Sequence, residues 1–213
     1  MNKNVIVVGS GGHAKVVIDI LHEMKFVKIH GVTSNSLLPE SQFFGYPVLG
    51  EDAVLKQFSN SNYLIAMGLG GYRNNNSREQ LFKYVKELGF NFINAIHPTA
   101  IISKTVKLGE SVVIFPGAIL NTDVQIGDNS IVATGTTIDH ESIIGNNVLI
   151  SAGVTVGAYS IIMDNALLAL GSKVISGVKI GKNALVAAGA VVVKDVIDNE
   201  IVFGVPARKI NRL

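Results

Sequence analysis

One histidine in the second half of the chain has the surroundings of a general base. His140 lies between two carboxylates, in the triplet Asp139-His140-Glu141, and no other imidazole occurs after residue 97. Imidazole can accept a proton near neutral pH, and a neighbouring carboxylate can fix its tautomer. We therefore interpret His140 as a candidate catalytic base whose tautomer one of the two flanking carboxylates could fix. The alternative is a solvated surface histidine without a chemical role.

A second group of interest is a glycine-rich turn near the N-terminus. The apolar run from Val5 to Val8 predicts a buried strand, and a helix is expected from about Lys15 to Met24. Between them the chain carries residues typical of a loop that approaches a phosphate, because glycines let backbone amides come close to an anion at a helix N-terminus. These residues are Gly9, Ser10, Gly11, Gly12, His13 and Ala14.

The second expected strand ends without an acidic residue. Ile29 to Val32 is followed by Thr33, Ser34 and Asn35. A dinucleotide-binding domain carries an Asp or Glu at this point to bind the ribose. We therefore do not expect NAD binding, although the spacing of the glycines resembles the dinucleotide fingerprint.

A second glycine-rich loop follows the third expected strand, Tyr63 to Met67, and begins at Gly68. A helix is expected from Ser77 to Leu88, and short strands or connections at Gln42 to Val48 and Asn91 to Ala95. In open α/β sheets the carboxyl ends of parallel strands bind ligands, so we expect an anion or nucleotide at these two loops. The alternative is that the glycines only turn the chain. Two arginines flank the second loop and would either contact a phosphate or be solvated, namely Arg73 and Arg78.

The elements that must position His140 belong to a repeat of six residues. Every sixth residue from Ile102 to Val192 is aliphatic, and a small or β-branched residue follows each of them four positions later, from Val106 to Val196. A Leu-Gly or Ile-Gly pair recurs at multiples of eighteen residues, as at Leu108 and Ile126. A period of six fits neither a helix nor a long hairpin, but it fits a triangular solenoid with one short strand per side. His140 should then project outward near a corner.

Composition limits the remaining classes of function. The 213 residues carry a net charge of +2 and are 48% hydrophobic, which predicts neither nucleic-acid nor anionic-membrane binding. The chain has no cysteine, so disulfides, thiolate zinc sites and a cysteine nucleophile are excluded. Its start does not resemble a signal peptide, and its longest apolar stretch, Ala184 to Val193, is too short to span a bilayer. We expect a cytoplasmic protein without membrane insertion.

The repeat resembles the left-handed parallel β-helix of hexapeptide-repeat acyltransferases. Further motifs make the whole chain resemble the sialic acid O-acetyltransferase and nucleotide-amino-sugar N-acetyltransferase family: the turn from Gly9 to Lys15, His97-Pro98-Thr99-Ala100, the His140 triplet, the coil from Ala187 to Val192, and Gly204-Val205-Pro206-Ala207-Arg208. The resemblance implies an α/β N-terminal Rossmann-like βαβ domain at residues 1–96. It also implies an all-β left-handed parallel β-helix with a C-terminal tail at residues 97–213.

The resemblance also implies roles for individual residues. His140 would deprotonate the acceptor, and Glu141 would orient it. Amides near Gly157 and Ala158 would meet the developing oxyanion. Acetyl-CoA, the co-substrate, would contact Ala187, Ala188, Gly189, Gly204, Pro206 and Arg208, with Lys209 near its nucleotide end. The diphosphate of a nucleotide-linked sugar would face residues Gly9, Ser10, Gly11, Gly12 and His13, with Gly68 beside them.

The chain departs from the family pattern at two places. Thr33, Ser34 and Asn35 stand where relatives often keep an acidic pair, and Leu149 stands where they commonly carry a second histidine. The resemblance further implies a homotrimer with acetyl-CoA between neighbouring β-helices. Outward aliphatic side chains are expected at its interfaces, such as Val112, Leu149 and Leu167.

These observations together predict an acetyl-CoA-dependent N-acetyltransferase. The expected acceptor is the 4-amino group of a nucleotide-linked 4-amino-4,6-dideoxy sugar made for surface glycans, attacked directly without a metal or a covalent enzyme intermediate. O-acetylation of a sialic-type sugar remains an alternative, as does a non-catalytic scaffold or nucleotide sensor. A β-helix carbonic anhydrase is excluded, because it needs three imidazoles around zinc and this solenoid has only His140.

Overall fold

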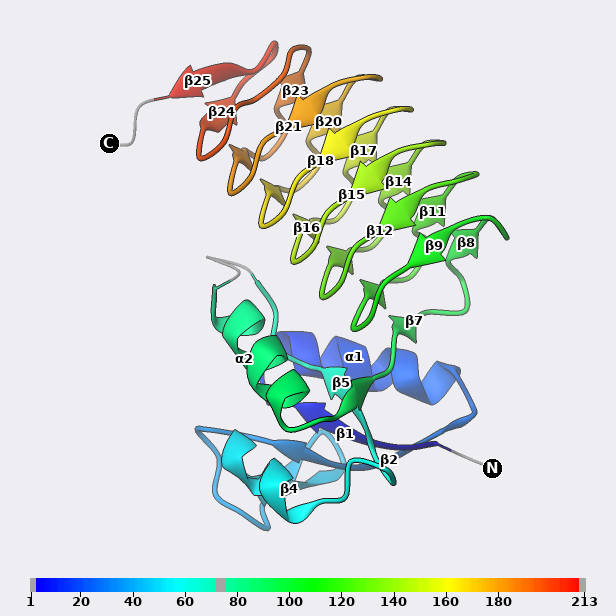
Figure 1. Cartoon of the computed structure of the whole chain (residues 1–213), viewed down its shortest axis with the longest axis vertical. Coiled ribbons are helices and arrows are strands. Elements are labelled where there is room, and N and C mark those ends of the chain that lie inside the picture. Colours follow the sequence, from blue (N-terminus) through cyan, green and yellow to red (C-terminus); the bar gives the residue numbers. More distant parts are fainter. Residues whose placement is uncertain (1–2, 72–75, 211–213) are drawn as a thin grey trace. The chain divides into compact units, whose positions relative to one another are not determined.

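A computed structural model describes residues 3–71 and 76–210, and contacts within the chain divide it into two compact units. The first unit comprises Met1–Pro98 and the second Thr99–Leu213 (Figure 1). Among the described residues, no helix is both long enough and apolar enough to cross a membrane.

The first unit is an α/β sheet with the strand order β3-β4-β2-β1-β5-β6. The pairs β1–β2, β1–β5, β2–β4 and β5–β6 are parallel, and β3–β4 is an antiparallel hairpin. The strands are β1 Lys3–Val8, β2 Val27–Thr33, β3 Gln42–Phe43, β4 Tyr46–Gly50, β5 Leu64–Met67, β6 Asn91–Phe92 and the short β7 Ala95–Ile96. The helices are α1 Gly12–Glu23, the 3-10 helix η1 Asp52–Gln57 and α2 Asn76–Glu87.

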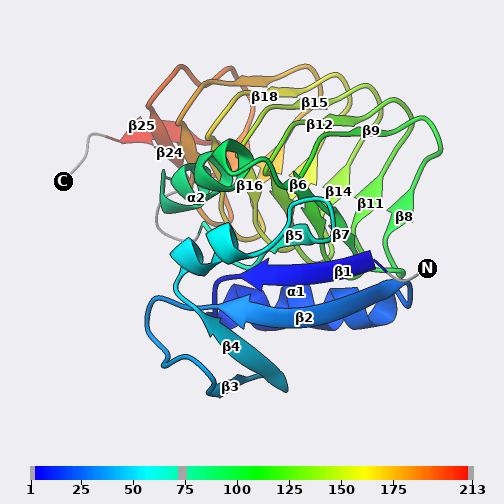
Figure 2. The same cartoon turned by 60° about the horizontal axis from the view of Figure 1, so that its bottom comes forward.

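The core of this unit follows from its apolar pattern. Val5 to Val8 in β1 are fully buried, as expected for a central parallel strand covered on both faces. Figure 2 shows α1 running along β1 and β2, and its buried residues recur at helical spacing, from Ala14 to Leu21. The expected start of α1 at Lys15 is wrong by one turn, because the helix already begins at Gly12. The short strands expected from Gln42 to Val48 are present as β3 and β4, which form a hairpin.

The second unit is a left-handed parallel β-helix built mostly from strands of two residues, as the hexad repeat and the family resemblance predicted. Figure 1 shows its coils stacked one on the next. One face holds β8 Ile101–Ile102, β11 Ile119–Leu120, β14 Thr137–Ile138, β17 Thr155–Val156, β20 Lys173–Val174 and β23 Val191–Val192. The next face holds β9 Lys107–Leu108, β12 Gln125–Ile126, β15 Ile143–Ile144, β18 Ile161–Ile162 and β21 Lys179–Ile180. The third holds β10 Val113–Ile114, β13 Ile131–Val132, β16 Leu149–Ile150, β19 Leu167–Leu168, β22 Leu185–Val186, β24 Ile201–Phe203 and β25 Arg208–Ile210.

Two inward positions per hexad fill the axis of the solenoid. The second residue of a strand is aliphatic and buried, as at Ile150 and Ile162, which are both fully buried. The small residue four positions later is also buried, and where it carries a hydroxyl it bonds to the next coil: Ser142 Oγ donates to the carbonyl of Gly157 at 3.0 Å. Val112 belongs to this second series and is fully buried, so its expected exposure is wrong. Leu149 and Leu167 are half-buried.

The axial position should govern stability more strongly than an outward position of the same residue type. We expect Ile162→Ala to lower the free energy of unfolding by about 2–5 kcal/mol, because it leaves a cavity between coils. Ile101→Ala is the matched control, since Ile101 is 66% exposed and should lose less than about 1 kcal/mol. Denaturant unfolding of the two variants measures the difference, and equal losses would contradict the assignment of the axis.

Candidate functional site

His140 stands two residues after the end of β14, at the corner that leads to β15. Its side chain is 43% exposed, so the expected outward projection near a corner is confirmed. Nδ1 of His140 lies 3.8 Å from Oε1 of Glu141, and Glu141 itself has φ 57, the left-handed conformation that turns the corner. Of the two flanking carboxylates, Glu141 is therefore the one beside the ring.

The other flanking carboxylate, Asp139, is bonded to the backbone and to the preceding coil. Its Oδ1 accepts a hydrogen bond from the backbone amide of His140 at 2.8 Å and another from Nδ2 of Asn121 at 2.8 Å. These two hydrogen bonds, the first above all, hold the pKa of Asp139 below its usual range. Asp139 therefore stays ionised and fixes the main chain at His140.

Tyr159 completes the surroundings of His140 and was not predicted from the sequence. Its ring meets the imidazole edge to face, with the centroids 5.0 Å apart and the planes at 86°. Its hydroxyl is hydrogen-bonded to Glu141, and this bond, together with the charge of the carboxylate, raises the pKa of Tyr159. The repeat could have predicted this contact, because Tyr159 stands eighteen residues after Glu141 and the coils repeat at that distance.

The two residues expected near the oxyanion lie one coil beyond His140. The Gly157 amide donates to the carbonyl of Val174 at 2.9 Å and is thus part of the ladder between coils. A Cβ at Gly157 would lie 2.5 Å from the backbone nitrogen of Ser176, so this position requires glycine for packing. Ala158 stands eighteen residues after His140, and among the described residues its amide donates no backbone ladder bond.

The residues expected to contact acetyl-CoA come together at the C-terminal end of the solenoid. Ala188 and Gly189 are exposed in the loop between β22 and β23, and Ala187 beside them is half-buried. The tail turns at Gly204 and Pro206 and returns as β25, which pairs antiparallel with β24. The amide of Ala207 donates to the carbonyl of Val191 at 2.7 Å, which holds the exposed Arg208 next to this coil.

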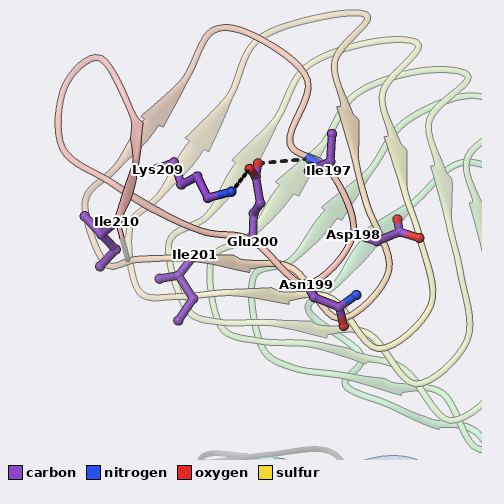
Figure 3. Close-up of a pocket in the computed structure, with 7 residues that line it drawn as sticks. All are labelled: Ile197, Asp198, Asn199, Glu200, Ile201, Lys209 and Ile210. Carbon is purple, nitrogen blue, oxygen red and sulfur yellow. Dashed lines mark hydrogen bonds and ion pairs between the residues drawn. The ribbon is translucent and has the colours of Figure 1, made fainter. Parts of the chain in front are cut away.

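A cavity of about 470 Å³ lies at the same end of the unit (Figure 3). Glu200 and Lys209 cross it with an ion pair, Nζ to Oε1, of 2.8 Å, and Oε2 of Glu200 accepts the backbone amide of Ile197 at 3.2 Å. The hydrogen bond from Lys209 lowers the pKa of Glu200. The expected ligand contact of Lys209 therefore competes with this pair. His140 does not line the cavity.

The two glycine-rich loops of the first unit lie together, as predicted, at the carboxyl ends of β1 and β5. Gly9 has φ 106, and a Cβ there would lie 3.1 Å from the carbonyl carbon of Gly68. A Cβ at Gly68 would lie 2.8 Å from a methyl group of Val7. Gly11 caps α1 and Gly12 begins it, so the amides of the first turn point out of a helix N-terminus. Ser10 stands between Gly9 and Gly11 in this turn.

A half-buried histidine, His13, and a buried arginine, Arg78, lie behind this turn. Burial, with a smaller contribution from the charge of Arg78, lowers the pKa of His13 from 6.5 to about 3. Arg78 is 1% exposed and donates to the carbonyl of Leu69, and burial lowers its pKa to about 9. His13 is therefore neutral at physiological pH, and the alternative of a solvated Arg78 is wrong. Arg73 lies outside the described residues.

Comparison with known proteins first gives the class. The model of the PglD N-terminal domain matches residues 4–85, and that of the bacterial transferase hexapeptide (six repeats) matches residues 105–140. The fold and both matches define a hexapeptide-repeat transferase with a PglD-type front domain.

Individual relatives narrow the class. PerB from Caulobacter crescentus, solved with CoA and GDP-perosamine, is 32% identical with a TM-score of 0.90, over 98% of this chain and 97% of that one. The acetyltransferase domain of PglB from Neisseria gonorrhoeae FA1090, solved with acetyl coenzyme A, is 27% identical with a TM-score of 0.90, over 99% and 100%. The UDP-N-acetylbacillosamine N-acetyltransferase of Bacillus subtilis (strain 168) is 30% identical over 115 residues, which are 53% of this chain and 51%, about half, of that protein.

The chain therefore belongs to the nucleotide-amino-sugar N-acetyltransferase family of hexapeptide-repeat proteins, and the resemblance seen in the sequence is confirmed. One further structure of the GDP-perosamine N-acetyltransferase carries a histidine-to-alanine substitution and contains CoA and GDP-perosamine. Among the residues that the structure describes, no group of three His, Cys, Asp or Glu side chains could hold a metal ion. The roles of single residues stay predictions.

The pKa of His13 predicts how stability depends on pH. The unfolded chain binds a proton at this imidazole near pH 6.5 and the folded chain only near pH 3, so the unfolded state holds more protons between those values. The free energy of unfolding should fall as the pH falls through this window, by up to about 1.4 kcal/mol per pH unit for one proton. His13→Gln should flatten this slope in denaturant unfolding between pH 4.5 and 7.5. The same slope in both proteins would contradict a buried neutral imidazole.

Proposed function

We propose that the protein transfers the acetyl group of acetyl-CoA to the 4-amino group of a nucleotide-linked 4-amino-4,6-dideoxy sugar made for surface glycans. One observation carries the proposal. An outward imidazole, flanked by Glu141 and Tyr159, stands on the corner of a hexapeptide solenoid whose relatives were solved with CoA and an amino-sugar nucleotide. The neighbours of at least 25% identity named above are N-acetyltransferases or acetyltransferase domains, which favours nitrogen over oxygen as the acceptor atom.

His140 acts as the general base in this proposal. Glu141 faces Nδ1, which leaves Nε2 to take the proton from the attacking amine. The amine nitrogen forms a bond to the thioester carbonyl carbon, and the carbon–sulfur bond then breaks. The protonated imidazole returns its proton to the departing sulfur, so the products are the N-acetylated sugar and free CoA thiol. No covalent enzyme intermediate is needed.

Tyr159 and Ala158 support this chemistry from the next coil. Tyr159 holds the Glu141 carboxylate through its hydroxyl and packs against the imidazole, so it acts as a positioning residue. The Ala158 amide is the donor for the oxyanion, since the Gly157 amide is already bonded to Val174. Of the two residues predicted to lie near the oxyanion, Gly157 and Ala158, this assignment selects Ala158 as the donor.

Both substrates have proposed binding segments. The exposed small residues Ala188 and Gly189 leave room for a pantetheine chain beside Ala187, and Arg208 supplies a cation for the phosphates of CoA, next to Gly204 and Pro206. The turn from Gly9 to His13, with Gly68 behind it, receives the diphosphate of the sugar nucleotide through its backbone amides. Because acetyl-CoA and sugar nucleotides are cytoplasmic metabolites, we place the protein in the cytoplasm.

Replacing the base should abolish turnover. We expect His140→Ala to lower kcat/KM by at least roughly a hundredfold, because it removes general-base assistance. The assay follows CoA thiol release with UDP-, dTDP- and GDP-linked 4-amino sugars and with free sialic acid. His30→Ala is the matched control, since His30 is exposed in the middle of β2 and should retain activity.

The outcomes of this assay separate the alternatives. Turnover of free sialic acid alone would establish O-acetylation. No turnover with any acceptor, or a His140→Ala variant as active as the wild type, would overturn the proposed mechanism and favour a scaffold or a nucleotide sensor.

We also propose a homotrimer. Ile143 and Ile161 are 42% and 41% exposed, they are neighbours in the β15–β18 pair, and each follows a corner of the His140 site by two residues. A partner packed on them would bury apolar surface and stand next to His140. We expect a trimer mass in sedimentation at micromolar concentration and its dissociation by Ile161→Glu, but not by Ile101→Glu on another face. A monomer mass for the wild type would contradict the assembly.

A further inference from the structure

A carboxylate lies at the carboxyl end of β2, although it belongs to a residue well beyond β2 in the sequence. Thr33 and Ser34 at the end of β2 are buried, and the five residues that follow them include no acid. The Thr33 hydroxyl nevertheless donates to Oδ1 of Asp52, and Asn35 Nδ2 donates to Oδ2 of Asp52 at 3.2 Å. The backbone amide of Asp52 in turn donates to Oδ1 of Asn35 at 3.4 Å. Asp52 is thereby fixed at the carboxyl end of β2.

Strand pairing explains how a residue so far along the chain arrives at this place. β4 lies parallel to β2, with Thr33 opposite Gly50, and the carbonyl of Gly50 accepts the amide of Ser34 at 2.8 Å. Asp52 follows β4 just as Asn35 follows β2. Because parallel strands end at the same edge of a sheet, the two side chains meet.

The same carboxylate is connected to the glycine turn by one hydroxyl. The amide of Gly9 donates to Thr33 Oγ1 at 3.2 Å, and that hydroxyl donates to Asp52. Ser10 Oγ donates to Ser34 Oγ at 2.6 Å, which forms a second link between the turn and the end of β2. The segment proposed for the diphosphate and the Asp52 carboxylate thus belong to one hydrogen-bonded group.

We infer that Asp52 accepts two adjacent hydrogen-bond donors of the nucleoside in the sugar nucleotide, an inference that rests on the proposed function. Each carboxylate oxygen accepts one of the bonds described above, and a carboxylate oxygen can accept two. Asp52 is half-buried, so a ligand can reach it. In doubly wound folds a carboxylate at the end of the second strand binds the ribose next to a phosphate held by the first glycine turn. Asp52 supplies that carboxylate from a different strand.

Two sources offer such a pair of donors: the 2′ and 3′ hydroxyls of ribose, and N1–H with the N2 amine of guanine. Calorimetric titration of the full chain with GDP, 2′-deoxy-GDP, IDP and UDP distinguishes them. Ribose recognition favours GDP over 2′-deoxy-GDP. Guanine recognition favours GDP over IDP and UDP.

In either case we expect Asp52→Asn to weaken the binding of the preferred nucleotide by roughly 10- to 100-fold and to remove the preference, since one hydrogen bond to a charged acceptor has about that effect. Asp19→Asn is the matched control, because Asp19 is an exposed carboxylate on α1 and should bind as the wild type does. Asp52→Glu keeps the charge and moves the carboxylate, so it should weaken the preference even if Asp52→Asn does not fold. Thermal unfolding checks each variant.

The outcomes also separate this inference from the proposed function. Wild-type affinity and preference in a folded Asp52→Asn or Asp52→Glu variant, with acetyl transfer intact in the wild type, would overturn the role of Asp52 alone. A wild type that binds none of the four nucleotides and releases no CoA thiol would overturn both. Nucleotide binding that depends on Asp52, in a wild type without acetyl transfer, would support the inference and contradict the proposed reaction.

Discussion

The hydrogen-bond ladder between coils is the constraint on which the second unit depends. Each coil donates its strand amides to carbonyls of the next coil, as from Thr137 to Val154, and paired strand residues lie eighteen positions apart, as Thr137 and Thr155 do. This fixed distance places chemically unrelated residues in columns. Asn121 meets Asp139 in one column, and Glu141 meets Tyr159 in another. The surroundings of His140 are thus assembled from three successive coils, and each coil contributes only short side chains or a single ring.

In the first unit, hydroxyl groups keep the polar edge at the glycine turn ordered. Two basic side chains lie directly behind the glycine turn, a neutral His13 and the buried Arg78, and burial lowers the pKa of both. Hydroxyls from Ser10, Thr33 and Ser34 then connect the turn to the end of β2. Hydroxyls can reorient as donors or acceptors, so this edge stays adaptable toward the anionic part of a ligand while the backbone remains fixed.

The features that follow from the six-residue repeat could be predicted from the sequence. The hexads gave the number of residues per side, the axis and the corner position of His140, since each follows from counting in register. The same register would have given Tyr159, eighteen residues after Glu141, but a single outward tyrosine has no local pattern that marks it. Val112 was wrongly predicted to be exposed. Each hexad has a second inward position four residues after the axial one, and Val112 occupies it. The residue type did not reveal this, because β-branched side chains also suit exposed strand positions.

What could not be predicted depends on pairing between distant strands. Asp52 reaches the end of β2 only because β4 pairs beside it, and neither the strand order nor the β3–β4 hairpin has a signature in the residues around Thr33. Likewise the start of α1 at Gly12 depends on the packing of Ala14 and Val17 rather than on helix propensity, which is poor for glycine.

The C-terminal hairpin has a consequence for how long the solenoid can become. A coil of this kind presents an edge of unpaired backbone groups at each end, and parallel strands of a second molecule could in principle continue the stack. β24 still pairs in parallel with β22, but β25 returns antiparallel and places Arg208 and Lys209 on the outer edge. The reversal of direction removes the template for another parallel coil. The hairpin therefore acts as a terminator that keeps a repetitive fold from growing into a fibre.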